Sequence, residues 1–554
     1  MCGIYGYIGK NAYNQVFNGL SLLQYRGYDS CGIAYFENGE FKINKAVGVL
    51  NKLNKVQTKS KIAFGHTRWA TNGVVNYLNT HPHISFDKKT IIVHNGIVKN
   101  AEIIKEELKN KGINFYSNTD TEVIANYLSY GDFTTNLNNI FNKLKGSFSL
   151  IIAREDIIYL VKKFSPLNIL KTKNEIIISS DVSSLKDGGL YSLIDNDILM
   201  IKNNQIFSLT DHKIKFIKHE NELKSTKLGV FNHFMIKEIN DTPQAILDCY
   251  NYLSNLDLTF LSNYSKITLV GCGTAYNSCL IAEYFLNRYT KFKVNTILAS
   301  NYENNRKISK KHLFVIVSQS GETADCIKVA ENIIKYGGKF LAVTNEPNST
   351  IARKTCMHIF TKAKKEFAVA STKTYCCQLF IFSYIIKKLK NPNFTMDINN
   401  FTQKLKHQIS NCDIDEIVKK IQNLKHLILI GKDIDYLTLL EASLKIREID
   451  YIYTLPIYSG ELKHGTLSLI DENSVVLALN SSNDDNKLQI AKNEIISRGG
   501  TVFDMEKFVE TDIDELFKPI FTIIPFQLIS YKTAINLGRN PDMPRNLAKS
   551  VTVE

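Results

Sequence analysis

The second residue of the chain is a cysteine, and its position gives it a particular chemistry. Cells remove an initiator methionine when the next residue is small, so we expect Cys2 to become the first residue of the mature chain. It then carries a thiol and an α-amino group that titrates near ~8, a base beside its own sulfur. A thiolate is the reactive nucleophile, and an N-terminal amine can activate it without a histidine. The alternative is a chance cysteine at a frayed terminus.

Further reactive types are grouped in four short clusters of the N-terminal third, at 2–6, 25–32, 66–73 and 94–97. Arg68 can hold a carboxylate in a bidentate fork. Asn95 and the backbone N–H of Gly96 are suitable donors to a developing oxyanion, and Asp120 can take an α-ammonium group. Each residue alone has a plainer interpretation: Arg68 in a surface ion pair, and Asn95-Gly96 as a type I′ hairpin turn.

The elements that must position these clusters are strands with helices between them. Within residues 1–210, apolar runs predict strands at 61–70, 90–98, 148–154 and 174–181, and helical periodicity predicts helices at 101–110 and 121–130. Asp120, Thr119 and Thr121 are capping candidates for the second helix. A β-rich domain with interspersed helices is therefore expected.

These clusters resemble the class II glutamine amidotransferases, whose nucleophile is N-terminal and whose fold is of the αββα type. The resemblance implies that Cys2 attacks the side-chain amide of glutamine while Asn95 and Gly96 line the oxyanion hole. It also implies that Arg68 and Asp120 hold the α-carboxylate and α-amino groups of glutamine and that Trp69 caps the glutamine site.

A second part of the chain alternates strand and helix. The runs 266–285, 312–334 and 339–352 each read as a buried strand, a turn and a helix, which indicates a parallel sheet with helices on both faces. The turns carry Ser and Thr and suit a bound phosphate at a helix start. The donors proposed in these turns are Thr274, Ser318, Gln319, Ser320 and Thr323, and Ser371 and Lys373 farther along the chain could add to them. Ordinary N-capping is the alternative for any one of them.

A faint repeat suggests a second lobe of the same kind. Residues 426–446 echo 266–285, 459–461 echo 320–322, and 474–484 echo the strand and loop of 339–349. Glu441, Lys445 and Glu448 fall at i, i+4 and i+7, so they are expected to share one face of the helix in this lobe. A surface Glu–Lys pair worth ~0.3–0.5 kcal/mol is the plainer interpretation of that spacing.

Two more residues could transfer protons or form an imine. His464, in GELKHG, is of the type best suited to proton transfer at neutral pH. Lys549, in the tail 542–554, could form a Schiff base if it were desolvated. Otherwise it is a solvated tail lysine.

From CGI to PRNLAKSVTVE, the chain resembles amidotransferases that join a glutaminase to two sugar-isomerase-type (SIS) lobes and act on a ketose phosphate. The resemblance implies that fructose 6-phosphate and glutamine become glucosamine 6-phosphate and glutamate, the first step of hexosamine synthesis. It places the donors named above on the sugar phosphate. His464 would open the ring, Lys549 would form an imine at carbon 2, and Glu448 would move the proton between carbons 1 and 2. Glu441 and Lys445 would support Glu448.

The same resemblance predicts how the chain is divided and how nitrogen travels. The expected parts are a glutaminase domain at 2–213, a linker at 214–256, SIS lobes at 257–395 and 418–544, and a catalytic tail at 545–554. Ammonia would pass through an enclosed channel, gated by Trp69 and the tail. A homodimer is expected, because His464 can come from a neighbouring subunit.

Some positions depart from the family pattern. Asn72, Ala275 and Thr466 replace a usual His, Ser and Pro, and 454–457 replaces a segment that usually carries a Glu. None removes a proposed catalytic residue. The alternatives are an amidotransferase acting on another sugar phosphate, one using phosphoribosyl pyrophosphate, and a non-catalytic sugar-phosphate sensor. An amidotransferase using phosphoribosyl pyrophosphate needs a paired-acid loop that this sequence lacks. A non-catalytic sensor has no use for Cys2, Glu448 or Lys549.

Composition limits the remaining possibilities. A chain of 554 residues with 44% hydrophobic and 22% charged residues is typical of a soluble protein with roughly three or four domains. No apolar run reaches the ~18 residues of a membrane helix, and no signal peptide is expected. The net charge of +14 is spread thinly, so no nucleic-acid partner is expected. Ten cysteines without CxxC spacing favour reduced thiols in the cytoplasm, and neither a metal nor a cofactor is expected.

Overall fold

The computed structural model describes residues 2–70, 73–219, 228–481 and 486–549, which belong to two compact units. The first unit holds the described residues up to His219, and the second holds those from 228 to Lys549. Asn72, residues 220–227 of the predicted linker and residues 550–554 of the predicted tail lie outside the described residues. The remainder of the predicted linker contains strand β14 (Ile217–His219) and helix α6 (Phe234–Leu253).

The first unit is built from two antiparallel sheets. One has eight strands in the order β14-β11-β9-β10-β1-β4-β2-β3, and the other has six in the order β13-β12-β8-β7-β6-β5. The strands are β1 (Gly3–Ile8), β2 (Ser30–Glu37), β3 (Glu40–Val47), β4 (Ile62–Arg68), β5 (His83–Ile84), β6 (Thr90–Val98), β7 (Gly146–Arg154), β8 (Ile157–Lys163), β9 (Asn168–Lys171), β10 (Ile176–Ser179), β11 (Gly188–Ser192), β12 (Ile198–Lys202) and β13 (Gln205–Ser208), besides β14. The four predicted strands are thus confirmed as β4, β6, β7 and β10.

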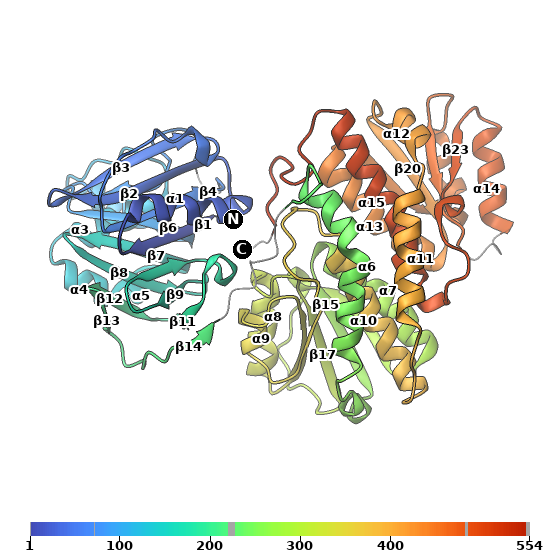
Figure 1. Cartoon of the computed structure of the whole chain (residues 1–554), viewed down its shortest axis with the longest axis horizontal. Helices are drawn as coiled ribbons and strands as arrows, with labels where there is room; N and C mark the ends of the chain where they lie inside the picture. The colour runs from blue at the N-terminus through green and yellow to red at the C-terminus, as the bar shows by residue number, and fades with distance from the viewer. Residues whose placement is uncertain (1, 71–72, 220–227, 482–485, 550–554) are drawn as a thin grey trace. The chain divides into compact units, whose positions relative to one another are not determined.

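Helices cover the outer faces of both sheets. They are α1 (Ala12–Leu23), α2 (Ala101–Lys109), α3 (Asp120–Ser129), α4 (Phe133–Asn138) and α5 (Ile140–Lys143). Strand β1 shows the reason for the layering, because its side chains alternate: Ile4 joins the core between the sheets, while Tyr5 and Tyr7 join the core under α1. A third core lies between the six-stranded sheet and α2–α5. The result is the predicted αββα arrangement (Figure 1).

The second unit contains two parallel sheets. The first lobe has the strand order β16-β15-β17-β18-β19, and the second has β21-β20-β22-β23. The strands are β15 (Lys266–Gly271), β16 (Lys293–Leu298), β17 (His312–Val317), β18 (Lys339–Thr344), β19 (His358–Phe360), β20 (His426–Gly431), β21 (Tyr453–Tyr458), β22 (Val475–Ala478) and β23 (Thr501–Asp504). The departure at 454–457 lies in β21, an edge strand, where Pro456 is tolerated.

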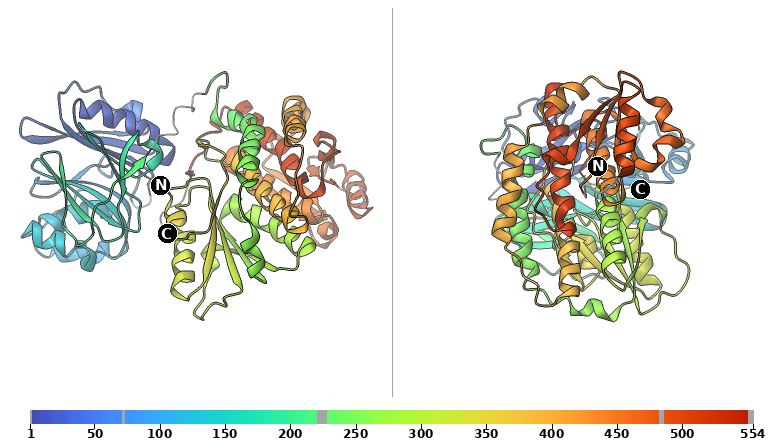
Figure 2. Two further views of the ribbon diagram at one scale, coloured as in Figure 1. Left: turned by 60° about the horizontal axis from the view of Figure 1, so that its bottom comes forward. Right: turned by 90° about the vertical axis from the view of Figure 1, so that its right-hand side faces the viewer.

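Helices pack on both faces of each parallel sheet, as the strand–turn–helix pattern predicts. Besides α6 they are α7 (Gly273–Tyr289), α8 (Ala324–Lys335), α9 (Thr350–Arg353), α10 (Lys373–Lys390), α11 (Ile398–Asn411), α12 (Asp415–Ile421), α13 (Asp433–Asp450), α14 (Asn486–Ile496) and α15 (Lys518–Asn536). One large core joins α6, α7, α10, α13 and α15 to one face of each sheet, and smaller cores lie under α8 and α14. The two lobes can be followed in Figure 2 by their yellow-green and orange-red strands.

The two lobes share a topology, but the predicted alignment of the repeat is shifted by one strand. In each lobe the first strand (β15 or β20) leads through a long helix to an edge strand (β16 or β21) and then to its other neighbour (β17 or β22). Residues 459–461 therefore correspond to the segment after β16, not to 320–322. Strand β22, in 474–484, corresponds to β17 and not to the strand of 339–349. Short runs of similar residues, such as 320–322 and 459–461, therefore do not mark equivalent positions in the two lobes.

Two features concern the whole chain. No helix among the described residues is long and apolar enough to cross a membrane. All ten cysteines are free thiols.

Candidate active sites

The first candidate site lies where β1, β4 and β6 bring their ends together. Gly3 of β1 is in register with Thr67 of β4, so Cys2 lies beside the end of β4. The backbone N–H of Trp69 donates to the Cys2 sulfur at 3.3 Å, and the sulfur lies 3.4 Å from the Trp69 carbonyl oxygen. Burial raises the pKa of the Cys2 thiol, while the Trp69 backbone and the charge of Arg68 act in the opposite direction.

Asn95 reaches this cysteine from the other sheet. Its Nδ2 donates to the Cys2 carbonyl oxygen at 3.0 Å, and its Oδ1 lies 3.1 Å from His66 Nε2. His66 Nε2 also lies 3.0 Å from the His94 carbonyl oxygen, so this nitrogen carries the proton and donates to both oxygens. Burial holds the pKa of His66 down to about 3, so the ring is neutral. His66, which the sequence analysis missed, thus fixes the orientation of the Asn95 amide.

Gly96 lies inside β6, opposite Phe148 of β7, so the hairpin-turn interpretation of Asn95-Gly96 is wrong. Its φ is +134°, and an added Cβ would lie 2.0 Å from the Ser147 carbonyl oxygen. Only glycine fits this position, because the obstacle is backbone and the torsion is one that L-residues avoid.

The two residues predicted to hold the ends of glutamine are both sheltered. Arg68 ends β4 and is 3% exposed, which contradicts the surface ion-pair interpretation. Asp120 is the first residue of α3, whose N-cap is Thr119. The Asp120 carboxylate accepts the Val98 N–H at 2.9 Å and lies 3.7 Å from His94 Nδ1. Although burial alone would raise it, these partners lower the pKa of Asp120, so the group is an anion at neutral pH.

Asp29, just before β2, fixes the segment that follows β4. Asp29 accepts the Ala70 N–H at 2.9 Å, and its own N–H donates to the Arg68 carbonyl oxygen at 3.0 Å. The segment that follows β4 is therefore fixed at both its ends by one residue. Trp69, between them, is half-buried.

The second candidate site is in the second unit, at the carboxyl ends of the first-lobe strands. The Ser318 and Thr323 hydroxyls lie 2.9 Å apart in the turn after β17, and Ser320 Oγ accepts the Glu322 N–H at 3.1 Å. Gln319 and Ser320 are half-buried, and Thr323 is the N-cap of α8 without a side-chain capping bond. The simple capping interpretation therefore does not account for Thr323.

Helix α13 of the second lobe brings three charged residues to the start of α7. Lys445 Nζ lies 2.7 Å from Glu448 and 3.3 Å from Glu441, and both Lys445 and Glu441 are fully buried. Thr274 joins them, because its hydroxyl donates to Glu441 at 2.9 Å and accepts from Lys445 at 3.1 Å. The surface-pair interpretation is therefore wrong. Burial raises the pKa of Glu441, and the two glutamates raise that of Lys445 in spite of its burial.

The tail lysine is also buried. The Lys549 side chain is 5% exposed, and its Nζ lies 2.5 Å from Oε2 of Glu366, which is fully buried. Ser371 donates to the same oxygen at 2.9 Å. The solvated-lysine interpretation is wrong, and Glu366 is a second residue that the sequence analysis missed. Nothing in its local sequence distinguishes it, because Lys364 and Lys365 before it suggest a surface segment.

The remaining predicted residues are less closely joined to the site. Lys373, 3% exposed at the start of α10, lies 3.8 Å from Asp241 of α6. His464 ends the 3₁₀ helix Ser459–His464 and is exposed. Ala275 is buried in α7, and Thr466 begins a short 3₁₀ helix. Within the described residues, no group of three or more His, Cys, Asp or Glu side chains is arranged to hold a metal ion.

Comparisons with known proteins agree with this division. A glutamine amidotransferase domain model matches residues 66–187, and a SIS domain model matches 260–388 and 420–525. Over the full length of both chains, the sequence is 34% identical to a protein of Caldanaerobacter subterraneus subsp. tengcongensis named glutamine–fructose-6-phosphate aminotransferase (isomerizing). The chain belongs to that family.

Other members of the aminotransferase family give the same result. The proteins of that name from Pyrococcus horikoshii and Aquifex aeolicus are 33% and 32% identical, again with 100% of both chains covered. A solved structure, the C-terminal domain of glucosamine-fructose-6-phosphate aminotransferase from Francisella tularensis, is 30% identical with a TM-score of 0.50. It covers 58% of this chain and 100% of that chain. The likeness to this aminotransferase family thus extends over both units.

Proposed function

We propose that this chain converts fructose 6-phosphate and glutamine into glucosamine 6-phosphate and glutamate. The observation that carries the proposal is the presence of two sites of different chemistry in a chain aligned over its full length with this aminotransferase family. One site has a nucleophile with oxyanion donors, and the other has a buried lysine and a carboxylate on a SIS-type scaffold. In a cell the reaction would begin amino-sugar (hexosamine) synthesis.

In the first half-reaction, Cys2 attacks the side-chain amide of glutamine. After Met1 is removed, the α-amino group of Cys2 takes the thiol proton and passes it to the departing ammonia. Asn95 Nδ2 and the Gly96 N–H stabilise the oxyanion, and His66 holds the Asn95 amide in the donating orientation. Arg68 and Asp120 provide the cation and the anion that a free amino acid requires. Water then releases glutamate from the thioester.

In the second half-reaction, the turn after β17 holds the phosphate with Ser318, Gln319, Ser320 and Thr323, and Thr274, Ser371 and Lys373 line the same site. Lys549 forms an imine with carbon 2, for which its 5% exposure supplies the desolvation. Glu448 transfers the proton between carbons 1 and 2. Lys445, between Glu441 and Glu448, fixes the position of that carboxylate.

Three features complete the proposal. Ammonia is transferred in an enclosed channel with Trp69 and the tail as gating elements, because free ammonia is mostly protonated at neutral pH. The chain forms a homodimer in which the exposed His464 serves the neighbouring subunit's sugar ring. The glutaminase domain and the two SIS lobes act as separate parts of the chain, with β14 of the predicted linker in the first unit's sheet and α6 in the second unit's core. The enzyme works in the cytoplasm, where its ten thiols stay reduced.

The experiment is mass spectrometry of a reaction with amide-¹⁵N glutamine and fructose 6-phosphate. Wild type is compared with Cys2→Ala and Lys549→Ala, and unlabelled ammonia is added to Cys2→Ala as a control for an intact sugar site. Labelled glucosamine 6-phosphate from wild type alone is the expected result. Labelled ammonia without amino sugar would retain the glutaminase but identify a different acceptor, such as another sugar phosphate. Absence of both products would refute the proposal.

A further inference from the structure

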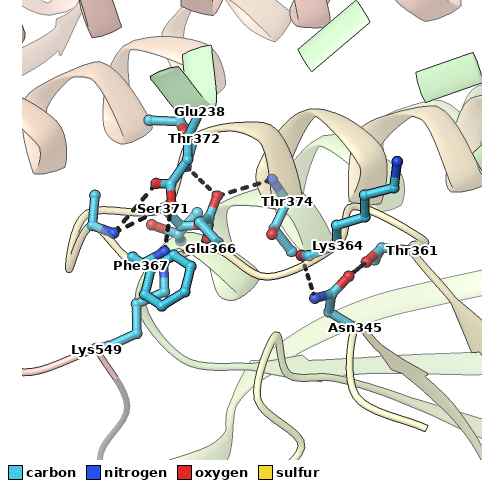
Figure 3. A network of polar contacts seen from close by, with 12 residues as sticks. Glu238, Asn345, Thr361, Lys364, Glu366, Phe367, Ser371, Thr372, Thr374 and Lys549 are labelled. Carbon is cyan, nitrogen blue, oxygen red and sulfur yellow. Dashed lines mark hydrogen bonds and ion pairs between the residues drawn. The ribbon is translucent and has the colours of Figure 1, made fainter. Parts of the chain in front are cut away.

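Glu366 lies at the centre of a polar network that reaches Lys549 (Figure 3). Its Oε1 accepts the backbone N–H groups of Thr372 and Thr374 at 2.9 and 3.1 Å. Its Oε2 accepts the Ser371 hydroxyl at 2.9 Å and Lys549 Nζ at 2.5 Å. Each oxygen thus has two donors, and this buried carboxylate has its hydrogen-bonding capacity filled.

A second buried glutamate lies beside the first. Glu238 of α6 is 1% exposed and accepts the backbone N–H groups of Phe367 and Ala368, next to Glu366 in the chain. Burial and the negative charge of Glu366 raise the pKa of Glu238 to about 8. Burial alone would also raise the pKa of Glu366, but Lys549 and the backbone donors lower it to about 2. One carboxyl therefore carries the negative charge, and the other carries a proton.

Among the residues that the structure describes, Lys549 is the cation in direct contact with Glu366. Lys549 makes direct contact with it, whereas Lys373 lies 3.8 Å from Asp241, and Asp241 also pairs with Lys237 at 2.5 Å. Because Glu366 stays ionised, it is a poor proton acceptor. Its contribution must come from its fixed charge.

We propose that Glu366 is the counter-ion of Lys549 throughout imine chemistry, and so a positioning residue for the reaction. This rests on the proposed role of Lys549. The ammonium of Lys549 first passes one proton to the carbonyl oxygen of carbon 2, and the neutral amine so formed adds to carbon 2. A second N–H proton then moves to that oxygen, which leaves as water, so the C–N bond replaces the C–O bond and the iminium nitrogen keeps one proton and the positive charge. Ammonia then adds to carbon 2, and lysine leaves as ammonium while carbon 2 keeps a neutral imine.

The charge balance of these two steps explains why a permanently ionised partner suits this lysine. The positive charge is on the lysine nitrogen before imine formation, after it and after release. A fixed carboxylate at 2.5 Å stabilises that nitrogen at each stage without itself gaining or losing a proton. Because Oε2 also accepts from Ser371, the lysine is held at a defined place relative to a residue of the proposed sugar-phosphate site.

The test is the yield of a reduced adduct on Lys549 after fructose 6-phosphate and sodium borohydride are added to the full chain. In Glu366→Gln we expect the yield to fall at least about tenfold and kcat for the amino sugar to fall about 10²-fold. KM for fructose 6-phosphate should change less than about threefold, and hydrolysis of glutamine without sugar should not change. Glu366→Asp keeps the charge and should restore the adduct to within about threefold of wild type.

A matched control is Asp435→Asn. Asp435 is a buried carboxylate of the same unit that accepts a backbone N–H and a hydroxyl from Ser481, at 2.8 and 2.6 Å. Like Glu366 it accepts both a backbone N–H and a serine hydroxyl, but no contact between described residues joins it to Lys549, so the adduct yield of Asp435→Asn should equal that of wild type. A loss as large as that in Glu366→Gln would overturn the proposal, because any buried carboxylate would then matter equally.

The outcomes separate this inference from the function on which it rests. A wild-type adduct that is undiminished in Glu366→Gln overturns the counter-ion role and leaves Lys549 as the imine residue. No wild-type adduct on Lys549 refutes both. If Glu366→Gln does not fold, as judged by cooperative unfolding, Glu366→Asp decides: an adduct yield below about a tenth of wild type in the folded Asp variant overturns the proposal.

Discussion

The two lobes of the second unit have the same backbone conformation at the start of their first long helix, but their functional side chains differ. Cys272 before α7 and Lys432 before α13 have φ, ψ of −130°, 147° and −132°, 150°, and the next residues, Gly273 and Asp433, have φ of 53° and 50°. In the first lobe the polar side chains lie in the turns after the strands. In the second they lie on the face of α13. A duplicated scaffold thus provides a binding end in one lobe and a proton-transfer helix in the other.

The largest expected effect comes from Glu448, on the proton-transfer helix. Glu448→Gln keeps the shape and the Lys445 contact but removes the group that accepts the proton. We expect kcat for amino-sugar formation to fall about 10³-fold or more while the borohydride adduct on Lys549 still forms. Steady-state kinetics and adduct mass spectrometry measure both. If Glu448→Gln changed KM alone, α13 would contribute to binding and not to proton transfer, and the two lobes would not differ in this respect.

The next effect concerns stability. Lys445→Met leaves the buried Glu441 without its cation, and breaking a buried ion pair from one side costs about 3–5 kcal/mol. Chemical unfolding of the full chain should show this loss. A matched change is Lys463→Met, which removes an exposed partner of Glu494 and should cost less than about 1 kcal/mol. An equal loss of unfolding free energy in the two variants would mean that the buried ion pairs of α13 stabilise the fold no more than a surface pair does.

A substitution in the proposed phosphate-binding turn of the first lobe should change KM for fructose 6-phosphate. Ser320→Ala removes one hydroxyl from the proposed phosphate site, and a hydrogen bond to a charged group contributes about 1.5–3 kcal/mol. KM for fructose 6-phosphate should therefore rise about tenfold or more with kcat nearly unchanged. A fall in kcat without a rise in KM would instead assign the turn after β17 to the chemical step.

A fourth prediction uses pH and Glu238, whose pKa is raised to about 8 in the folded chain from 4.5. Stability from its protonated form is complete below about pH 4.5 and is lost as the pH rises through about 8. Glu238→Gln cannot ionise, so its free energy of unfolding relative to wild type should increase between about pH 4.5 and about pH 8 and then level off. Thermal unfolding at several pH values measures this, and a constant difference would show that Glu238 is already ionised.

The smallest effects are expected at Gly273 and Asp433, the first residues of α7 and α13. Gly273→Ala places a Cβ at a φ of 53° and should cost about 1 kcal/mol, although nothing lies within 4 Å of that Cβ. Asp433→Gly relieves strain at the same torsion but removes a negative charge from the first turn of α13, so a net change within about 0.5 kcal/mol is expected. Unfolding midpoints of both variants test whether the two backbones are energetically equivalent.

The sequence predicts those parts of the molecule that depend on local pattern. Strand β6 begins and ends at the predicted residues because apolar residues lie on both sides of its His94-Asn95-Gly96 segment. The Ser- and Thr-rich turns follow from their place after buried strands. The resemblance to the amidotransferase family then assigns the candidate residues to two sites.

What the sequence does not predict depends on contacts between distant segments. Glu366 and Lys549 are 183 residues apart, and His66 meets Asn95 across two different sheets. The repeat was misaligned because strand order in space, and not similarity of letters, defines which segments correspond. The burial of Glu441 and Lys445 likewise depends on α7 and the helices around α13, which no spacing rule includes.

Gly96 has a consequence for genetics. The atoms that exclude a side chain there belong to the backbone of Ser147 and Phe148, at 2.0–2.8 Å from an added Cβ. A smaller neighbouring side chain cannot make room, so second-site suppressors of a Gly96 variant should not arise by substitutions in β7. Selection for restored growth on such a variant should return reversion to glycine at this codon.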